Sequence, residues 1–281
     1  MLDDKEFKAL IRLLDDDDPE ISEHVWSKLS SLGVAGIRRL EAEWEVQEDP
    51  VIQGKIEDLI DSISTRAVTQ DLLSWRKGGG KDLLEGWLLL TKFHFPEIDL
   101  NIYRNEVNRL VNKTWLEVNN SMDSVSRLRV LNHILFVMEA YTGNRFSTRY
   151  PQNSLLNYLV DQKQGNAFST GMLYMIVAQK LQFPVYGVIL PGYFVLFFKE
   201  GEKEFYVDAY NGGAFFTKTD LKRFISKLGI EDRPAFYKPT SNIYIILEVI
   251  KVLISDYEAM EQPEKAASLK KLLKDIEITF E

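Results

Sequence analysis

The chain has no cysteine and only three histidines among its 281 residues. The absence of cysteine excludes disulfide bonds, cysteine-ligated zinc and a cysteine nucleophile, and it agrees with a reducing compartment. None of His24, His94 and His133 has a second histidine four residues later, and none stands in a carboxylate cluster of ligand spacing. We therefore expect no metal site and no cofactor.

Long hydrophobic runs and basic clusters are also missing. Apolar segments such as 185–190 are far too short to cross a bilayer, and the acidic N-terminus lacks the apolar core of a secretory signal. The net charge is −8, from 34 basic and 42 acidic residues, and a field of that sign repels phosphate. These absences predict a cytoplasmic protein that binds neither membranes nor nucleic acid.

The N-terminal region has apolar residues at helical spacing through residues 7–44. Asp18-Pro19 and Asp49-Pro50 stand 31 residues apart, and each pair opens an amphipathic helix. This repeat suits two short HEAT-like hairpins, and a plain helical bundle with a chance repeat suits it equally well. We expect a helical, HEAT-like region over 1–66, then a transition over 64–80 that ends in a flexible glycine loop.

The periodicity changes in the second half of the chain. A well-marked helix over 168–181 is followed by three segments rich in β-branched and aromatic residues, at 185–190, 194–198 and 204–208. They predict an antiparallel meander packed on that helix, and thus an α+β core over 67–240. Thr219 or Asp220 is expected to cap a further helix. Two closing helices, split at Pro263, predict a C-terminal helical hairpin over 241–281.

A helix followed by strands is also the order of papain-like and transglutaminase-like folds, in which Cys opens the helix and His and Asp lie on successive strands. Four segments stand where transglutaminase-like domains have Gly-x-Cys, Gly-Ile-Pro, Gly-His and Asp-Pro: Gly165-Asn166-Ala167, Gln182-Phe183-Pro184, Gly192-Tyr193 and Asp208-Ala209. Five segments resemble the SirB-type transglutaminase-like family of bacterial proteins: 93–99, 143–145, 151–156, 190–194 and 208–213. The resemblance covers roughly residues 83–241.

The resemblance implies a catalytically degenerate member. Ala167 stands at the nucleophile position and has no reactive atom, and Tyr193 stands at the histidine position. A tyrosine with an ordinary pKa of about 10 is a poor general base at neutral pH. Only Asp208 of the triad remains, and we expect a protein that is not an enzyme.

Three classes of function remain open. The first is a non-catalytic interaction or regulatory module with a protein or peptide partner, which binds a peptide or small ligand in the vestigial cleft near Tyr193, Asp208, Asn153 and Asn211. Turn chemistry is a competing explanation for Asp208 and Asn211, and a core aromatic role is one for Tyr193. The second class is an unrecognised hydrolase or transferase, which would use Tyr193, Asp208, Ser169 and His94. The third is a purely structural or oligomerisation protein; the oligomeric state is left open.

Overall fold

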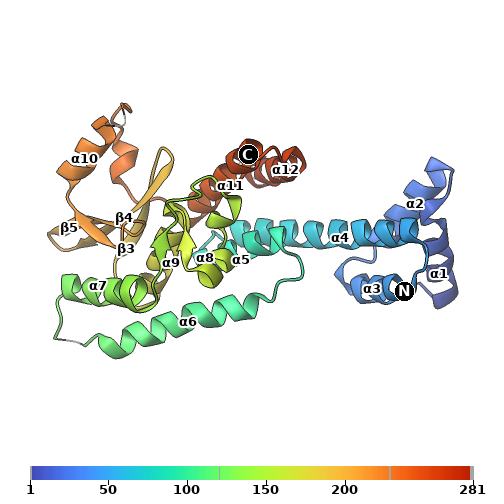
Figure 1. The fold of residues 1–281 in the computed structure, drawn as a ribbon, viewed down its shortest axis with the longest axis horizontal. Helices are drawn as coiled ribbons and strands as arrows, with labels where there is room; N and C mark the ends of the chain where they lie inside the picture. The colour runs from blue at the N-terminus through green and yellow to red at the C-terminus, as the bar shows by residue number, and fades with distance from the viewer. Residues whose placement is uncertain (1, 120, 228, 279–281) are drawn as a thin grey trace. The chain divides into compact units, whose positions relative to one another are not determined.

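The computed structural model describes residues 2–119, 121–227 and 229–278. Contacts between Cα atoms divide the chain into two compact units. Unit 1 contains residues 1–72 and 92–98, and unit 2 contains residues 73–91 and 99–281. Figure 1 shows the helices and strands of both.

Unit 1 is helical and has a hydrophobic core of its own. Its elements are α1 (Asp4–Arg12), a 3-10 turn (Leu13–Asp15), α2 (Pro19–Ser30), α3 (Val34–Val46) and the first part of α4 (Pro50–Lys77). The core gathers one apolar stripe from each helix, including Phe7, Leu29, Leu40 and Ile56. The predicted helical character of this region is present, because apolar residues at helical spacing bury one face of each helix.

The two Asp-Pro pairs both begin helices. Asp18 accepts a hydrogen bond from the Glu20 N–H at 2.9 Å, and Asp49 accepts one from the Val51 N–H at 2.9 Å. The following proline occupies the first helical turn, where a missing N–H costs nothing.

The predicted transition over 64–80 is wrong for most of its length. Helix α4 runs unbroken to Lys77, because Val68 and Leu72 bury one side of it. Gly79 and Gly80 then adopt positive φ angles of 87° and 59° and end the helix. The predicted boundary between residues 66 and 67 lies inside α4, and the division by contacts falls after Leu72.

Unit 2 holds the remaining helices. They are α5 (Leu83–His94), α6 (Leu100–Glu117), α7 (Ser124–Asn132) continued by a π-helical turn (His133–Met138), α8 (Leu156–Gln162), α9 (Ala167–Lys180), α10 (Lys218–Lys227), α11 (Asn242–Ala259) and α12 (Pro263–Ile278). Of α5, only the part up to Thr91 belongs to unit 2. Two short 3-10 helices, Pro151–Ser154 and Pro234–Tyr237, lie between them. Helix α12 packs on α11, and both belong to unit 2.

The larger sheet of unit 2 is antiparallel, in the order β3 (Val185–Leu190), β4 (Tyr193–Glu200), β5 (Lys203–Asp208) and β6 (Ala214–Phe216). Leu190 faces Tyr193 across the first hairpin, and Leu196 faces Val207 in the next pair. The meander predicted from residues 185–208 is present. Strand β6 is an addition to it, and so is the parallel pair β1 (Thr142–Gly143) and β2 (Gln164–Gly165), which is too short to show periodicity.

Helix α9 is the central element of unit 2 (Figure 1) and is buried along its length from Ala167 to Ala178. It packs closely on β4, and the absence of a side chain at Gly171 allows this, because a Cβ there would collide with the ring of Phe194. Phe168 stacks on the same ring, with centroids 5.2 Å apart. The start of the helix therefore adjoins the start of β4.

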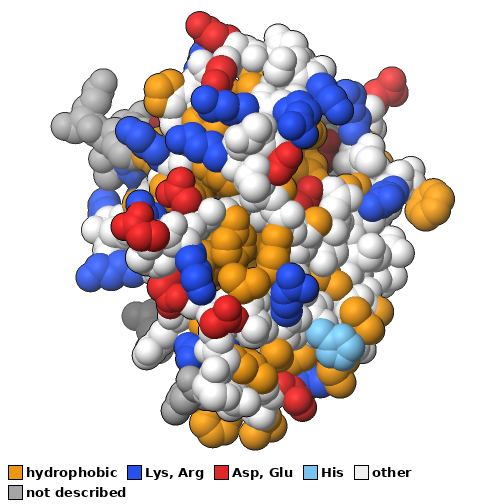
Figure 2. Space-filling view, turned by 90° about the vertical axis from the view of Figure 1, so that its left-hand side faces the viewer, with side chains coloured by type: hydrophobic (Ala, Val, Ile, Leu, Met, Phe, Trp, Pro, Cys, Tyr) orange, Lys and Arg blue, Asp and Glu red, His pale blue; other side chains and the backbone are white. Residues whose placement is uncertain are grey.

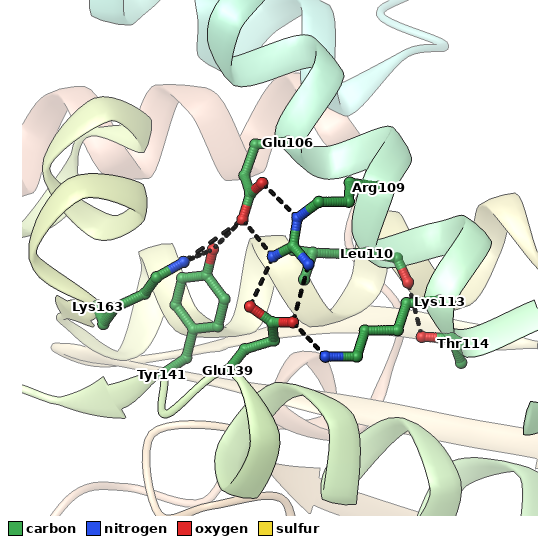
Figure 3. A network of polar contacts seen from close by, with 8 residues as sticks. All are labelled: Glu106, Arg109, Leu110, Lys113, Thr114, Glu139, Tyr141 and Lys163. Carbon is green, nitrogen blue, oxygen red and sulfur yellow. Dashed lines mark hydrogen bonds and ion pairs between the residues drawn. The ribbon is translucent and has the colours of Figure 1, made fainter.

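A polar network holds the segment that leads into β1 (Figure 3). The Arg109 guanidinium on α6 lies between Glu106 and Glu139, and Lys113 donates to Glu139 at 2.6 Å. The hydrogen bonds from Arg109 are the main reason that the pKa of Glu139 is lowered to about 2. Lys163 donates to the Tyr141 hydroxyl at 2.9 Å, just before β1. The network thus ties α6 to the chain just before β1 and to the chain just before β2.

Helix α10 has a different cap from the predicted one. Thr217, rather than Thr219 or Asp220, accepts from the Asp220 N–H at 3.2 Å, while the Asp220 carboxylate accepts from the Thr217 N–H at 3.0 Å. This reciprocal pair is a capping box, in which Asp220 takes the inner position.

Candidate functional site

Tyr193 begins β4 directly after a turn at Pro191-Gly192, in which Gly192 has a φ of 69°. The ring is half-buried between Tyr210 and Phe224, whose centroids are 6.0 and 5.8 Å from its own. These rings leave the hydroxyl group pointing at the end of β5.

Asp208 is the last residue of β5, and its carboxylate accepts from three polar groups. The Tyr193 hydroxyl lies 3.1 and 3.2 Å from its two oxygens. The Asn211 side-chain amide donates to it at 2.8 Å, and the Asn211 backbone N–H donates to it at 3.2 Å. The Asn211 amide also donates to the Tyr193 hydroxyl at 3.1 Å. Arg145 in turn donates to the Asn211 side-chain oxygen at 2.9 Å. The four side chains form one connected polar group.

Burial and then the negative charge of Asp208 raise the pKa of the Tyr193 hydroxyl far above its ordinary value. The phenol therefore stays protonated at neutral pH and donates its hydrogen bond to the carboxylate. A group in this state cannot accept a proton from a nucleophile or a water molecule. Its proton is engaged by Asp208, so toward a ligand the hydroxyl oxygen can only accept a hydrogen bond.

A cavity of about 430 Å³ opens beside this polar group. Its polar lining comes from Tyr193, Asp208, Asn211 and Asp220. Its apolar wall comes from β4, β6 and α10: Val195, Ala214, Phe216, Leu221 and Phe224. Figure 2 views the molecule from the side of α10, β5 and α7, and shows hydrophobic side chains in the middle of this face between charged side chains of both signs. The cavity is suited to an apolar group that carries a polar end.

Ala167 lies at the start of α9 and is 7% exposed. The Asn166 side chain caps the helix by accepting from the Ser169 N–H at 2.9 Å. The Phe168–Phe194 stack brings this helix start to the residue that follows Tyr193. The start of α9 therefore adjoins the start of β4, and the Tyr193–Asp208 hydrogen bond joins the start of β4 to the end of β5.

Asn153 does not belong to this group. It is fully buried, accepts from the Asn144 amide at 3.0 Å and donates to the Ser147 carbonyl at 2.5 Å. These bonds use its side chain to hold the loop that carries Arg145. Of the four predicted binding residues, the structure brings together Tyr193, Asp208 and Asn211, and it gives Asn153 a supporting place.

The sequence pattern indicates neither Arg145 nor Phe224 as a site residue, and it indicates Asp220 only as a helix cap. Arg145 stood within the segment Gly143-Asn144-Arg145, which had been noted for its resemblance only. Phe224 and Asp220 come from α10, and nothing in their local pattern indicates that this helix closes the cavity. His94 and Ser169 are not among the residues that line it, and Ser169 is fully buried.

Within residues 2–119, 121–227 and 229–278, no three or more His, Asp or Glu side chains are grouped so that they could hold a metal ion. In the same part of the chain, no helix has the length and apolar character needed to cross a membrane.

Comparison with known proteins gives relatives that are described only as UPF0162 proteins. One from Xylella fastidiosa (strain Temecula1) is 27% identical over 191 residues, which cover 66% of this chain and 68% of the relative. One from Vibrio cholerae is 26% identical over 132 residues, or 47% of this chain and 49% of the relative. No solved structure gives a significant match.

The family comparison covers more than half of the chain. The family described as the transglutaminase-like superfamily matches residues 101–251, a span that contains α9, the four-stranded sheet and the whole polar group around Asp208. On this match, and in agreement with the arrangement of α9, β4 and β5, the chain belongs to the transglutaminase-like superfamily.

Proposed function

We propose that this chain is a non-catalytic, SirB-type member of its superfamily, which binds an apolar side chain of a peptide or a small ligand in the cavity beside Tyr193. The observation that carries the proposal is the Tyr193–Asp208 hydrogen bond at the edge of an open cavity. The phenol occupies the expected place of the general base but keeps its proton, and Ala167 offers no nucleophile.

The cavity itself supports a binding role. Its volume of about 430 Å³ is within the range of small-molecule sites. Its wall is mainly apolar, and the hydroxyl of Tyr193 and the amide of Asn211 stand together at one end. Such a site takes a hydrophobic group and orients it by one or two hydrogen bonds. The helices of unit 1, which we propose to be HEAT-like, would offer a further interaction surface.

The test is a titration with N-acetyl-phenylalanine amide, followed by NMR. The probe has one aromatic ring and two amides, which match the apolar wall and the polar end of the cavity. We expect saturable shifts of the Asn211 side-chain and Ala214 backbone signals. Tyr193→Phe should weaken binding by roughly three- to ten-fold, because it removes the hydroxyl oxygen that can accept a hydrogen bond from an amide N–H of the probe. Tyr186→Phe, an exposed tyrosine on β3, is the matched control.

The same experiment tests the alternative of a hydrolase, because the probe contains amides that such an enzyme would cleave. The proposal expects the probe signals to stay unchanged over days of incubation. Time-dependent conversion to the acid that is lost in Tyr193→Phe would establish catalysis and refute the non-catalytic assignment. A titration with no shift at Asn211 or Ala214 would remove the binding role of the cavity.

A further inference from the structure

The loop after β1 exposes Phe146 to an unusual degree. Its side chain is 97% exposed, whereas the next most exposed large hydrophobic residue among those described, Leu116, is 74% exposed. Arg145 and Arg149 flank it, and residues 143–150 contain no acidic residue. The loop is therefore a basic segment with one aromatic ring directed into solvent.

Buried side chains hold this loop in its shape. Asn144, which is 6% exposed, accepts from the N–H groups of Phe146 and Ser147, both at 3.1 Å. Asn153 fixes Asn144 from one side and the Ser147 carbonyl from the other. Because two buried amides fix the turn, little conformational entropy remains to be lost when Phe146 binds a partner.

The cavity described above has the complementary properties. Its wall is apolar, its charged lining residues are the two acids Asp208 and Asp220, and no cation is among the described residues that line it. A benzyl group can enter a space of about 430 Å³, and a basic loop is electrostatically complementary to the two acids of the lining.

The loop and the cavity lie on the same face of unit 2. Arg145 in the loop donates to Asn211, which lines the cavity, and the Tyr210 hydroxyl donates to the Asn144 carbonyl at 2.8 Å. An isologous two-fold contact uses the same surface of both copies. A protruding side chain, here Phe146, and a cavity that adjoin each other on one surface therefore allow each copy to insert its side chain into the cavity of the other.

We propose that the occupant of the cavity is Phe146 of a second copy of this chain, in a reciprocal dimer; this inference rests on the proposed binding function. Each ring buries roughly 150–250 Å², so the two rings together supply less than half of the roughly 1,200–2,000 Å² of a stable interface. The dimer is therefore weak and concentration-dependent.

The first test is sedimentation equilibrium of the full chain from about 10 to 500 µM, the range in which a weak dimer dissociates. Wild type should show a monomer–dimer equilibrium. Phe146→Ser should raise its dissociation constant at least about ten-fold, and Ala214→Trp, which fills the cavity, should do the same. Leu116→Ser changes another exposed apolar residue and should leave the equilibrium unchanged. A dimer that survives Phe146→Ser overturns the proposal.

The second test uses the absence of natural cysteine. Ser147→Cys protein is mixed with Ala214→Cys protein under mild oxidation. Both variants keep Phe146. The proposal expects a disulfide-linked heterodimer in the mixture, well above the linked homodimer of either variant alone. A dimer in sedimentation without this link would show a different interface and overturn the inference.

The outcomes separate this inference from the function beneath it. A chain that is monomeric throughout but still binds N-acetyl-phenylalanine amide through Asn211 refutes the dimer and leaves the binding function standing. A monomeric chain whose cavity also fails to bind that probe refutes both the dimer and the binding function. A dimer that competes with the probe supports both.

Discussion

Asp256 is a carboxylate on α11 that the fold leaves only 7% exposed. Burial raises its pKa to about 6, and the positive charge of Arg149 offsets only part of this effect. A raised carboxyl pKa means that the folded chain binds a proton more tightly than the unfolded chain does. The ionised side chain therefore weakens the fold above a pH of about 6, and the fold gains stability as the pH falls from there toward about 4.

We predict that Asp256→Asn raises the free energy of unfolding near neutral pH by roughly 1–3 kcal/mol, because the amide needs no buried charge. The difference from wild type should shrink as the pH approaches about 4, where the wild-type carboxyl is protonated when folded. Urea denaturation of both proteins at about pH 7.5 and about pH 4.5 measures the difference in the free energy of unfolding at each pH. Asp61→Asn, on an exposed part of α4, is the control. A less stable Asp256→Asn protein at neutral pH would show that the carboxylate has a stabilising partner.

At the scale of elements, the contact between α9 and β4 decides the geometry of the site. It places the start of α9, at Phe168, beside Phe194, the residue that follows Tyr193, and it depends on the absence of a side chain at Gly171. Gly54 in α4 provides a contrast, since a Cβ there would meet no atom within 4 Å. Helix propensity alone predicts that alanine improves both helices.

We predict opposite signs for the two substitutions. Gly171→Ala should lower the free energy of unfolding by about 1–3 kcal/mol, because the new methyl group forces the Phe194 ring and α9 apart. Gly54→Ala should raise it by about 0.5–1 kcal/mol, because an open helix site gains from the lost freedom of the unfolded chain. The denaturation midpoints of the two variants, each compared with that of wild type, show the sign of each change. Equal stabilisation by both would mean that Phe194 moves aside without cost.

At the scale of the whole molecule, the chain contains two units that share the helix α4. Unit 2 has its own buried centre in α9 and its own sheet, and its first residues are part of its packing. The Trp75 indole donates to the Asp82 carbonyl at 2.7 Å and lies against Gly86. These contacts are all internal to unit 2.

We predict that a chain beginning at Leu73, which lacks residues 1–72 of unit 1, folds cooperatively. About 200 residues are enough to bury a sizeable core. Its thermal transition by circular dichroism should be sharp, and a chain beginning at Asp82 should melt at a lower temperature, because it lacks Trp75. A non-cooperative transition in the longer fragment would show that unit 2 needs residues 1–72 to fold.

The secondary structure was largely predictable from the sequence, because helix and strand periods are local. The strand over 185–190 coincides with β3, and the Asp-Pro pairs open α2 and α4. The family order of helix and strands was readable in the same way, as were the missing cysteine and the chemical character of Ala167 and Tyr193. Three of the four predicted binding residues meet because they lie near the ends of neighbouring strands.

Only the tertiary structure decided how distant segments meet. Arg145 and Asn211 are 66 residues apart, and their hydrogen bond follows from the turn that two buried asparagines hold. The cavity depends on α10 packing over β4 and β6. Helix α4 continues past residue 66 because Val68 and Leu72 are buried in the folded chain. A residue pattern shows which face of an element is apolar. It does not show which other element covers that face, because the free energy of burial depends on contacts made after the chain has folded.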